Sequence, residues 1–421
     1  MGQLISGSWA LLLGITLLMV GNGVQGTLLG IRGEIEGFST SEMSFVMSAY
    51  FLGFLGGSKL APEMIRRVGH VRVFAALASF ISAILVLYPT LANPWVWVFA
   101  RILIGFCFSG VYVTAESWLN NSVTNENRGK ALSLYMFVQM IGIIASQALL
   151  VAGDPSGYVL FVIPSILVSI SFAPILLSVS PTPAFGSTKT MKLKDLWGIS
   201  NLGFVGIFLL GGMFSAQFGM SAVFGTEAGL SITQISIFVS AFYVGAMICQ
   251  MPIGWLSDRI DRRQLILAVS ACAAVGASVG AVMADNFIAL LVSAAIIGGT
   301  SNPLYSLLLA HTNDYVGQED MAATSGALVF VNGLGAIAGP VVTGWLMTTF
   351  GAPAYFVVMI VLMVIMCVFT AHRMTKRAAI SVEDSGGYAV ISPTSSPVAV
   401  EFAQEYSQMS GNEDEDTANE R

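Results

Sequence analysis

The strongest constraint on this chain of 421 residues is that its first half recurs in its second half, about 192 positions later. The recurring pairs include GFSTSEMS at 37–44 with GLSITQIS at 229–236, SAYFLG at 48–53 with SAFYVG at 240–245, and, with one residue inserted, Tyr112 with Tyr305. A chain built from two like halves is expected to form two like units with a site between them.

Both halves have the composition of a membrane protein. Hydrophobic residues make up 55% of the chain, charged residues 10%, and the mean hydropathy is +0.78, whereas soluble proteins carry about 25% charged residues. A helix of about 20 apolar residues crosses the hydrocarbon core of a bilayer. We expect twelve such helices, near residues 8–31, 43–61, 72–92, 95–119, 131–153, 157–179, 199–224, 233–256, 265–284, 286–310, 323–349 and 354–373.

The basic residues predict the orientation, since cytoplasmic loops of membrane proteins carry an excess of Lys and Arg. With the N-terminus inside, 16 of the 18 basic residues fall on the cytoplasmic side, leaving Arg32 outside and Arg101 within a span. The first apolar segment is too long for a signal peptide and has no convincing cleavage site, so we expect it to be retained. The sequence therefore predicts a multi-pass protein of the inner (plasma) membrane with both termini cytoplasmic.

An all-α protein of two pseudo-symmetric six-helix bundles follows from the repeat. We expect the first bundle at 1–179, a cytoplasmic linker at 180–198, and the second bundle at 199–377. An even number of spans gives both bundles the same orientation, so an axis along the membrane normal relates them. Residues 378–421 are rich in acids and poor in apolar side chains, and we expect a disordered cytoplasmic tail.

Three motifs resemble those of the major facilitator superfamily over roughly 8–377. They are GWLSDRIDRR at 254–263, similar to that family's Gly-x-x-x-Asp-Arg-x-x-Arg-Arg loop, the Arg-x-x-x-Gly pattern from Arg101 to Gly105, and Gly339-Pro340 within the glycine-rich stretch 333–344. Other stretches, such as Ala115 to Trp118, look most like the YcaD-like branch, whose members have no settled substrate. The resemblance implies a twelve-helix transporter.

Two positions depart from the family's pattern. Arg66 stands in the first-half loop where the family usually has an Asp, and Ser146-Gln147 stands where antiporters carry Gly-Pro in the fifth span. Both departures weaken an assignment to drug–proton antiport.

Polar side chains within the expected spans are candidates for a substrate site, because an unpaired polar group in hydrocarbon is costly. The substrate-binding candidates are Asn22, Gln25, Arg101, Tyr112, Gln139, Gln217, Asn302, Tyr305 and Asn332. Several are repeat mates, which would place amides symmetrically about the axis. The alternative for the amides is hydrogen bonding between helices, and for the two tyrosines it is packing.

Arg101 and Glu116 share one face of the fourth span but lie too far apart to pair. Arg101 would bind an anionic group or bias the protonation of a carboxylate, and its alternative role is to brace neighbouring helices. Glu116 is the candidate for carrying a coupling proton, and its alternative is a side chain that reaches to the cytoplasmic surface.

Charged loop residues predict a gate on the cytoplasmic side. We expect Asp258 to lie against the start of the fifth span at Arg128 and to hold this side shut when the cavity faces outward. The gate candidates are Gly254, Asp258, Arg259, Arg262, Arg263, Arg66 and Arg67. The alternative for the arginines is the ordinary excess of positive charge on the inner side.

The sequence therefore predicts a secondary active transporter of a small polar or amphipathic solute that works by alternating access, with proton coupling as an option. The alternatives are a facilitative uniporter, or a transport-dead membrane receptor or regulator of the same fold. With three His residues, no metal-ligand spacing and no nucleophile with a base, we expect no enzyme, cofactor or metal. The expected partners are the solute, the lipid bilayer and, if coupled, protons; we expect a monomer that binds no nucleic acid.

Overall fold

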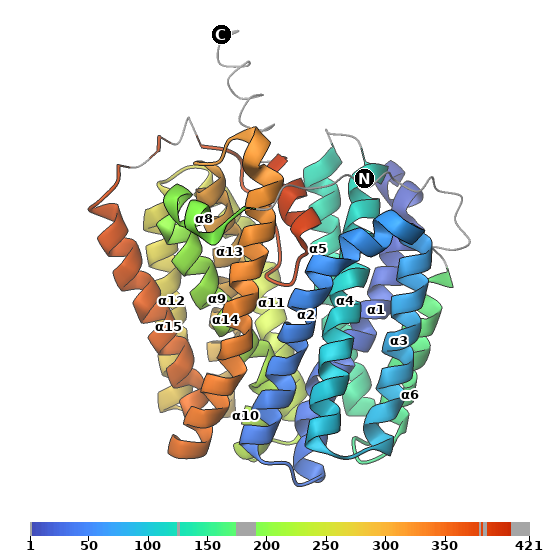
Figure 1. Ribbon diagram of the computed structural model, residues 1–421. Coiled ribbons are helices and arrows are strands. Elements are labelled where there is room, and N and C mark those ends of the chain that lie inside the picture. Colours follow the sequence, from blue (N-terminus) through green and yellow to red (C-terminus); the bar gives the residue numbers. More distant parts are fainter. Residues whose placement is uncertain (1, 124–126, 174–190, 379, 382–384, 406–421) are drawn as a thin grey trace.

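The structure is a computed structural model that describes residues 2–123, 127–173, 191–378, 380–381 and 385–405. These residues form helices and no strands (Figure 1). Within these ranges, ten helices are long and apolar enough to cross a membrane, and a shorter apolar helix lies at Val159–Ser171. The all-α prediction is confirmed.

The helices of the described residues form two bundles that stand side by side (Figure 1). The first bundle contains α1 (Gly2–Ile35), α2 (Thr40–Val68), α3 (His70–Thr90), α4 (Pro94–Ser122), α5 (Arg128–Ala152) and α6 (Val159–Ser171). The second contains α9 (Asn201–Gly219) continued by α10 (Ser221–Glu227), α11 (Ile232–Ser257), α12 (Arg262–Val282), α13 (Phe287–Asn313), α14 (Met321–Phe350) and α15 (Ala354–Met374). The short elements α8 (Leu193–Ile199) and η2 (Gln318–Asp320) lie outside the spans.

The repeat in the sequence reappears as the same local structure at the start of α2 and of α11. Gly37 and Gly229 have φ values of 77° and 70°, a conformation that glycine adopts without strain. Each is followed by a capping box, in which Ser39 pairs with Glu42 before α2 and Ser231 pairs with Gln234 before α11. The two bundles therefore begin their second spans in the same way.

Glycines also set the close crossing of helices inside each bundle. A Cβ on Gly53 of α2 would lie 1.9 Å from the Ile102 carbonyl oxygen of α4, and one on Gly245 of α11 would lie 2.0 Å from the Ala295 carbonyl oxygen of α13. No larger side chain fits at these contacts without moving a backbone. The close crossing of α2 with α4 therefore recurs in the second bundle as the crossing of α11 with α13.

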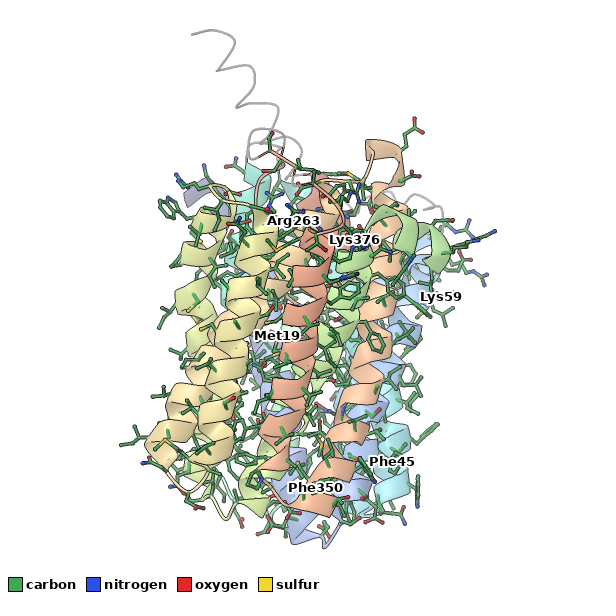
Figure 2. The ribbon with its side chains drawn as sticks, turned by 90° about the vertical axis from the view of Figure 1, so that its left-hand side faces the viewer. Met19, Phe45, Lys59, Arg263, Phe350 and Lys376 are labelled. Atoms are coloured by element: carbon green, nitrogen blue, oxygen red, sulfur yellow. The ribbon has the colours of Figure 1, made fainter. Side chains whose placement is uncertain are left out.

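The two ends of the molecule differ. One end, here called the terminal face, carries Lys59, Arg263 and Lys376, whereas Phe45 and Phe350 lie near the other end, the opposite face (Figure 2). At the opposite face the bundles touch: the Thr40 hydroxyl donates to the Glu227 carboxylate, and a Cβ on Gly30 of α1 would lie 2.6 Å from the Ala222 Cβ of α10.

At the terminal face, part of the chain's C-terminal region lies between the bundles (Figure 1). We call residues 385–405 the C-terminal segment. Residues 385–396 form an extended stretch with a turn, and residues 397–405 form a helix. The prediction that 378–421 is disordered is wrong for 385–405, because this stretch contains enough apolar residues to join the core, including Ile391, Val400 and Phe402. Residues 406–421 lie outside the described part of the chain.

Candidate functional site

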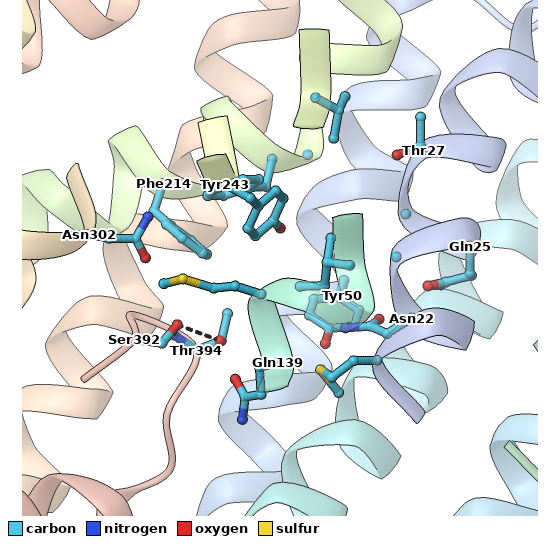
Figure 3. A pocket seen from close by; sticks show the side chains of 18 of the residues that line it. Asn22, Gln25, Thr27, Tyr50, Gln139, Phe214, Tyr243, Asn302, Ser392 and Thr394 are labelled. Atoms are coloured by element: carbon cyan, nitrogen blue, oxygen red, sulfur yellow. Dashed lines mark hydrogen bonds between the residues drawn. The ribbon is translucent and has the colours of Figure 1, made fainter. Parts of the chain in front are cut away.

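A cavity lies between the two bundles. Side chains of α1, α2, α4 and α5 line it from the first bundle, those of α9, α11 and α13 line it from the second, and Ser392 and Thr394 line it from the C-terminal segment (Figure 3). Its volume is about 110 Å³, well above the roughly 10–15 Å³ that one water needs. The cavity can therefore hold several waters or a small polar ligand.

Six of the nine substrate-binding candidates line this cavity. They are Asn22, Gln25, Arg101, Tyr112, Gln139 and Asn302. The Asn22 amide nitrogen donates to the Tyr112 hydroxyl at 3.1 Å, and the Tyr112 hydroxyl lies 3.6 Å from the Met19 sulfur. These six candidates come from four spans, α1, α4, α5 and α13, and converge on one polar space inside an otherwise apolar protein.

Arg101 is the single charged side chain among the described residues that line the cavity. It is 4% exposed, and its guanidinium lies 4.8 Å from the centre of the Tyr50 ring, a cation–π contact. One terminal nitrogen lies 3.5 Å from the Met47 sulfur, a weak acceptor, and Nε has no hydrogen-bond partner among the described residues. Arg101 therefore has unused capacity to donate hydrogen bonds to a ligand.

Gln25 has the same property, since neither its amide oxygen nor its amide nitrogen has a hydrogen-bond partner among the described residues. It is buried and lines the cavity from α1. A buried amide left unpaired costs about 1–3 kcal/mol. Water or a ligand in the cavity would remove that cost.

The other three candidates are not among the lining residues. The Gln217 side-chain oxygen accepts from the Ser301 hydroxyl at 2.9 Å, which ties α9 to α13, and Tyr305 is fully buried. Asn332 donates to the Pro393 carbonyl oxygen at 2.8 Å and so faces the C-terminal segment. α13 continues through Pro303 without interruption.

Glu116 is 2% exposed and does not extend to the surface. Its carboxylate accepts hydrogen bonds from the Tyr135 hydroxyl at 3.2 Å and from the Ser396 backbone N–H at 3.0 Å. It is the one acidic side chain buried within a span among the described residues. The C-terminal segment thus occupies the side of Glu116 that faces the gap between the bundles.

The loop between α11 and α12 contains the Asp258 gate candidate. Asp258 accepts a hydrogen bond from the Tyr388 backbone N–H at 3.0 Å, and the Arg262 guanidinium lies 3.8 Å from it. The expected partner region starts at Arg128, whose side chain lies outside the described part of the structure. In this structure Asp258 therefore contacts the C-terminal segment.

The arginines of this loop hold neighbouring acids and carbonyl groups. Arg262 is buried and pairs with Asp314; burial raises the pKa of the Asp314 carboxyl, although Arg262 and the Gly386 N–H act in the opposite direction. Arg263 pairs with Asp261 at 2.8 Å. Burial acts to raise the pKa of Asp261, but the hydrogen bonds from Arg263 outweigh it and hold that pKa below its usual range.

The remaining gate candidates have local contacts. Arg259 lies 4.1 Å from the centre of the Trp255 ring, and Arg66 and Arg67 are exposed and pair with Glu63 on their own helix. Gly254 faces Tyr388, since a Cβ there would lie 2.6 Å from a ring carbon of that tyrosine.

Several lining residues were not among the candidates. Tyr50 and Tyr243 line the cavity, and both lie in the recurring SAYFLG and SAFYVG segments, so the repeat was a usable signal for them. Gln147 also lines it from α5. Ser392 and Thr394 could not be found by searching spans, because they belong to the C-terminal segment.

Comparison with known proteins agrees with this architecture. The profile of the Major Facilitator Superfamily matches residues 11–231 and 202–402. A relative from Escherichia fergusonii, described as an uncharacterized MFS-type transporter YcaD, is 25% identical over 351 residues, which cover 82% of this chain and 90% of that protein.

Two solved structures share the fold. A variant of the nucleoside transporter NupG matches with a TM-score of 0.76 at 14% identity, covering 87% of this chain and 99% of that one. A variant of the E. coli fucose:proton symporter FucP matches with a TM-score of 0.58 at 16% identity, covering 88% and 99%.

Proposed function

The chain belongs to the major facilitator superfamily, and from that premise we propose that it is a secondary transporter of a small polar or amphipathic solute. The solute would occupy the cavity between the bundles and reach each side of the membrane in turn as the bundles rock. Membrane transport is the activity that the family and the named relatives share.

The observation that carries this proposal is a polar cavity at the interface of the two halves. Amides from Asn22, Gln139 and Asn302 enter it from both bundles, as Figure 3 shows. Polar groups in a membrane-embedded interior are costly unless they are paired or solvated. Their convergence where the two bundles can separate supports a binding site for a solute.

The cavity chemistry supports a solute with three features. Arg101 is suited to a negatively charged group, because its guanidinium can donate two parallel hydrogen bonds to a carboxylate or phosphate. The amides are suited to hydroxyl groups. The rings of Tyr50, Phe218 and Tyr243, which also line the cavity, are suited to an apolar or aromatic face.

Coupling and orientation belong to the same proposal. Glu116 is the group that would carry a coupling proton, since it is buried in a span and contacts the gap between the bundles. The terminal face would be cytoplasmic, because basic residues such as Lys59, Arg263 and Lys376 lie there (Figure 2).

Two measurements on the purified full chain test the function. A thermal-shift screen against sugars, nucleosides, amino acids, organic acids and lipophilic cations should identify a stabilising class, since a ligand of the folded state raises apparent stability. Proteoliposomes should then take up that class. If no solute binds or moves, with or without a pH gradient, the transporter proposal fails. If a solute binds but never moves, the receptor alternative is supported.

A further inference from the structure

The C-terminal segment (residues 385–405) occupies the space between the bundles at the terminal face (Figure 1). Its buried residues include Ile391, Ser396, Val400 and Gln404, and its apolar members are part of the same hydrophobic core as the transmembrane helices. It is therefore packed as an interior element, although it follows the last span.

The first part of the segment attaches to the second bundle. Arg262 donates to the Gly386 carbonyl oxygen, and the Gln250 amide donates to the Tyr388 hydroxyl at 2.9 Å. The Ile391 backbone N–H donates to the Ser306 hydroxyl at 3.0 Å. These contacts hold the segment along α11 and α13 as it enters the gap.

The turn at the tip of the segment reaches the cavity. Asn332 of α14 holds the Pro393 carbonyl oxygen, and the hydroxyls of Ser392 and Thr394 lie 2.9 Å apart within the lining (Figure 3). The tip thus takes up space that a solute would need at this end of the cavity.

The segment next contacts the first bundle. The fully buried Ser396 donates its backbone N–H to Glu116 of α4. Because Asn332 of α14 binds residue 393 and Glu116 binds residue 396, the segment bridges the two bundles within four residues.

The helix at 397–405 completes the packing. Pro397 stands at its first position, where a proline ring favours helix initiation. Val400 and Phe402 are buried, and the Gln404 amide donates to the Asn313 side-chain oxygen at 2.6 Å.

From these contacts we propose that the C-terminal segment is an autoinhibitory plug of the transport pathway. This inference rests on the proposed function and concerns the regulation of the same site. Alternating access requires the two bundles to approach each other at the terminal face when the opposite face opens. The plug contacts Glu116 of α4, Asn313 of α13 and Asn332 of α14, so it fills the space through which the bundles would move. While docked, it also blocks the solute path and engages Glu116, the proposed coupling group.

The connection to α15 allows the plug to leave. α15 ends at Met374 and the segment begins at residue 385. The ten residues between them allow an extended chain to span about 36 Å. Undocking therefore does not require α15 to unwind, and the transporter would work with the plug released.

Thiol labelling tests the plug without knowledge of the solute. The parent protein is the full chain with Cys107, Cys249, Cys272 and Cys367 replaced by Ser. It also carries Met140→Cys, because Met140 lines the cavity. A water-soluble maleimide is applied at the terminal face, and the rate at which it labels this cysteine is measured. Two sets of variants release the plug. In the first set, Tyr388→Ala removes a partly buried ring and Phe402→Asp places a charge at a buried position. In the second, Ser396→Pro removes the backbone N–H that donates to Glu116.

If the plug is docked nine-tenths of the time, the cysteine in the parent is accessible for only about one-tenth of the time. We therefore expect the released variants to be labelled at least about tenfold faster than the parent. Lys376→Ala, at an exposed position next to the end of α15, should label like the parent. Equal rates in the parent and both releasing variants would overturn the plug. Slow labelling in every variant would overturn it too, because something other than the segment would then close the cavity.

Uptake separates this inference from the proposed function. If the plug regulates transport, the releasing variants should take up the solute several-fold faster than the parent in proteoliposomes. Faster labelling with no uptake of any solute would leave the plug intact and reject the transporter. Uptake that is equally fast in the parent and the variants would reject the plug as an inhibitor while leaving the transporter intact.

Discussion

The hydroxyl oxygens of Ser41 on α2 and Thr348 on α14 lie 3.2 Å apart and join the two bundles at the opposite face. Close by, Thr40 contacts Glu227, and a Cβ on Gly344 would lie 2.3 Å from the Ser44 Cβ. The bundles are therefore closed at this face, whereas at the terminal face the C-terminal segment lies between them. This asymmetry is the structural basis of the access mechanism proposed above.

The helix crossings predict which glycines tolerate a methyl group. Gly53→Ala should lower the thermal stability, because the Cβ would lie 1.9 Å from the Ile102 carbonyl oxygen and overpacking costs about 1–3 kcal/mol. Gly56→Ala on the same helix is the control, since its Cβ would lie 3.8 Å from the nearest side-chain atom. Equal melting temperatures for the two variants in detergent would contradict this account of the crossing.

Replacing Arg101 should separate ligand binding from bracing of helices. Arg101→Met should weaken binding of an anionic solute by about 1.5–3 kcal/mol, the usual value of hydrogen bonds to a charged group, while an uncharged analogue binds as before. Arg101→Lys should recover only part of the loss, since Lys lacks the planar fork. Thermal-shift titrations measure both. If Arg101→Met lowers the unliganded melting temperature and affects both solutes equally, Arg101 is a brace.

Glu116→Gln should remove the pH dependence of uptake and leave exchange of solute across the membrane intact, because the amide keeps the shape of the side chain but carries no titrating proton. Uptake driven by an imposed pH gradient, compared with counterflow in the absence of one, measures the two activities. Unchanged dependence on pH in this variant would exclude Glu116 from coupling.

Gly254 and Tyr388 should act as one unit. Gly254→Ala places a Cβ 2.6 Å from the Tyr388 ring, so we expect it to displace the plug and to speed labelling at Met140→Cys. In a Tyr388→Ala background the clash is gone, and adding Gly254→Ala should change nothing further. Additive effects in this double-mutant cycle would show that Gly254 acts through the gate loop and independently of the plug.

Most of the fold could be predicted from the sequence, because hydropathy and the repeat depend on many residues at once. The repeat in the sequence pairs Ser39 with Ser231 and Gly53 with Gly245. In the structure the two serines form equivalent capping boxes, and the two glycines form equivalent close helix contacts. A mismatch at a single position therefore changes neither the hydropathy of a span nor the overall match between the two halves.

The site was less predictable, because polarity within a span does not reveal the direction in which a side chain points. Gln25 and Gln217 are repeat mates, yet Gln25 lines the cavity while Gln217 binds Ser301 inside its own bundle. The docked C-terminal segment was missed for another reason. Its apolar residues, such as Ile391 and Phe402, follow no regular spacing, and they pack because the two bundles present a matching gap.

A reversible crosslink across the opposite face tests alternating access most directly. The variant carries Ser41→Cys and Thr348→Cys, at hydroxyl positions 3.2 Å apart that suit a disulfide, in the background without native cysteines. Uptake of the solute identified by the screen is measured in proteoliposomes after oxidation and again after reduction. The account predicts that oxidation abolishes uptake and that reduction restores it. Equal uptake in the crosslinked and reduced states would contradict it.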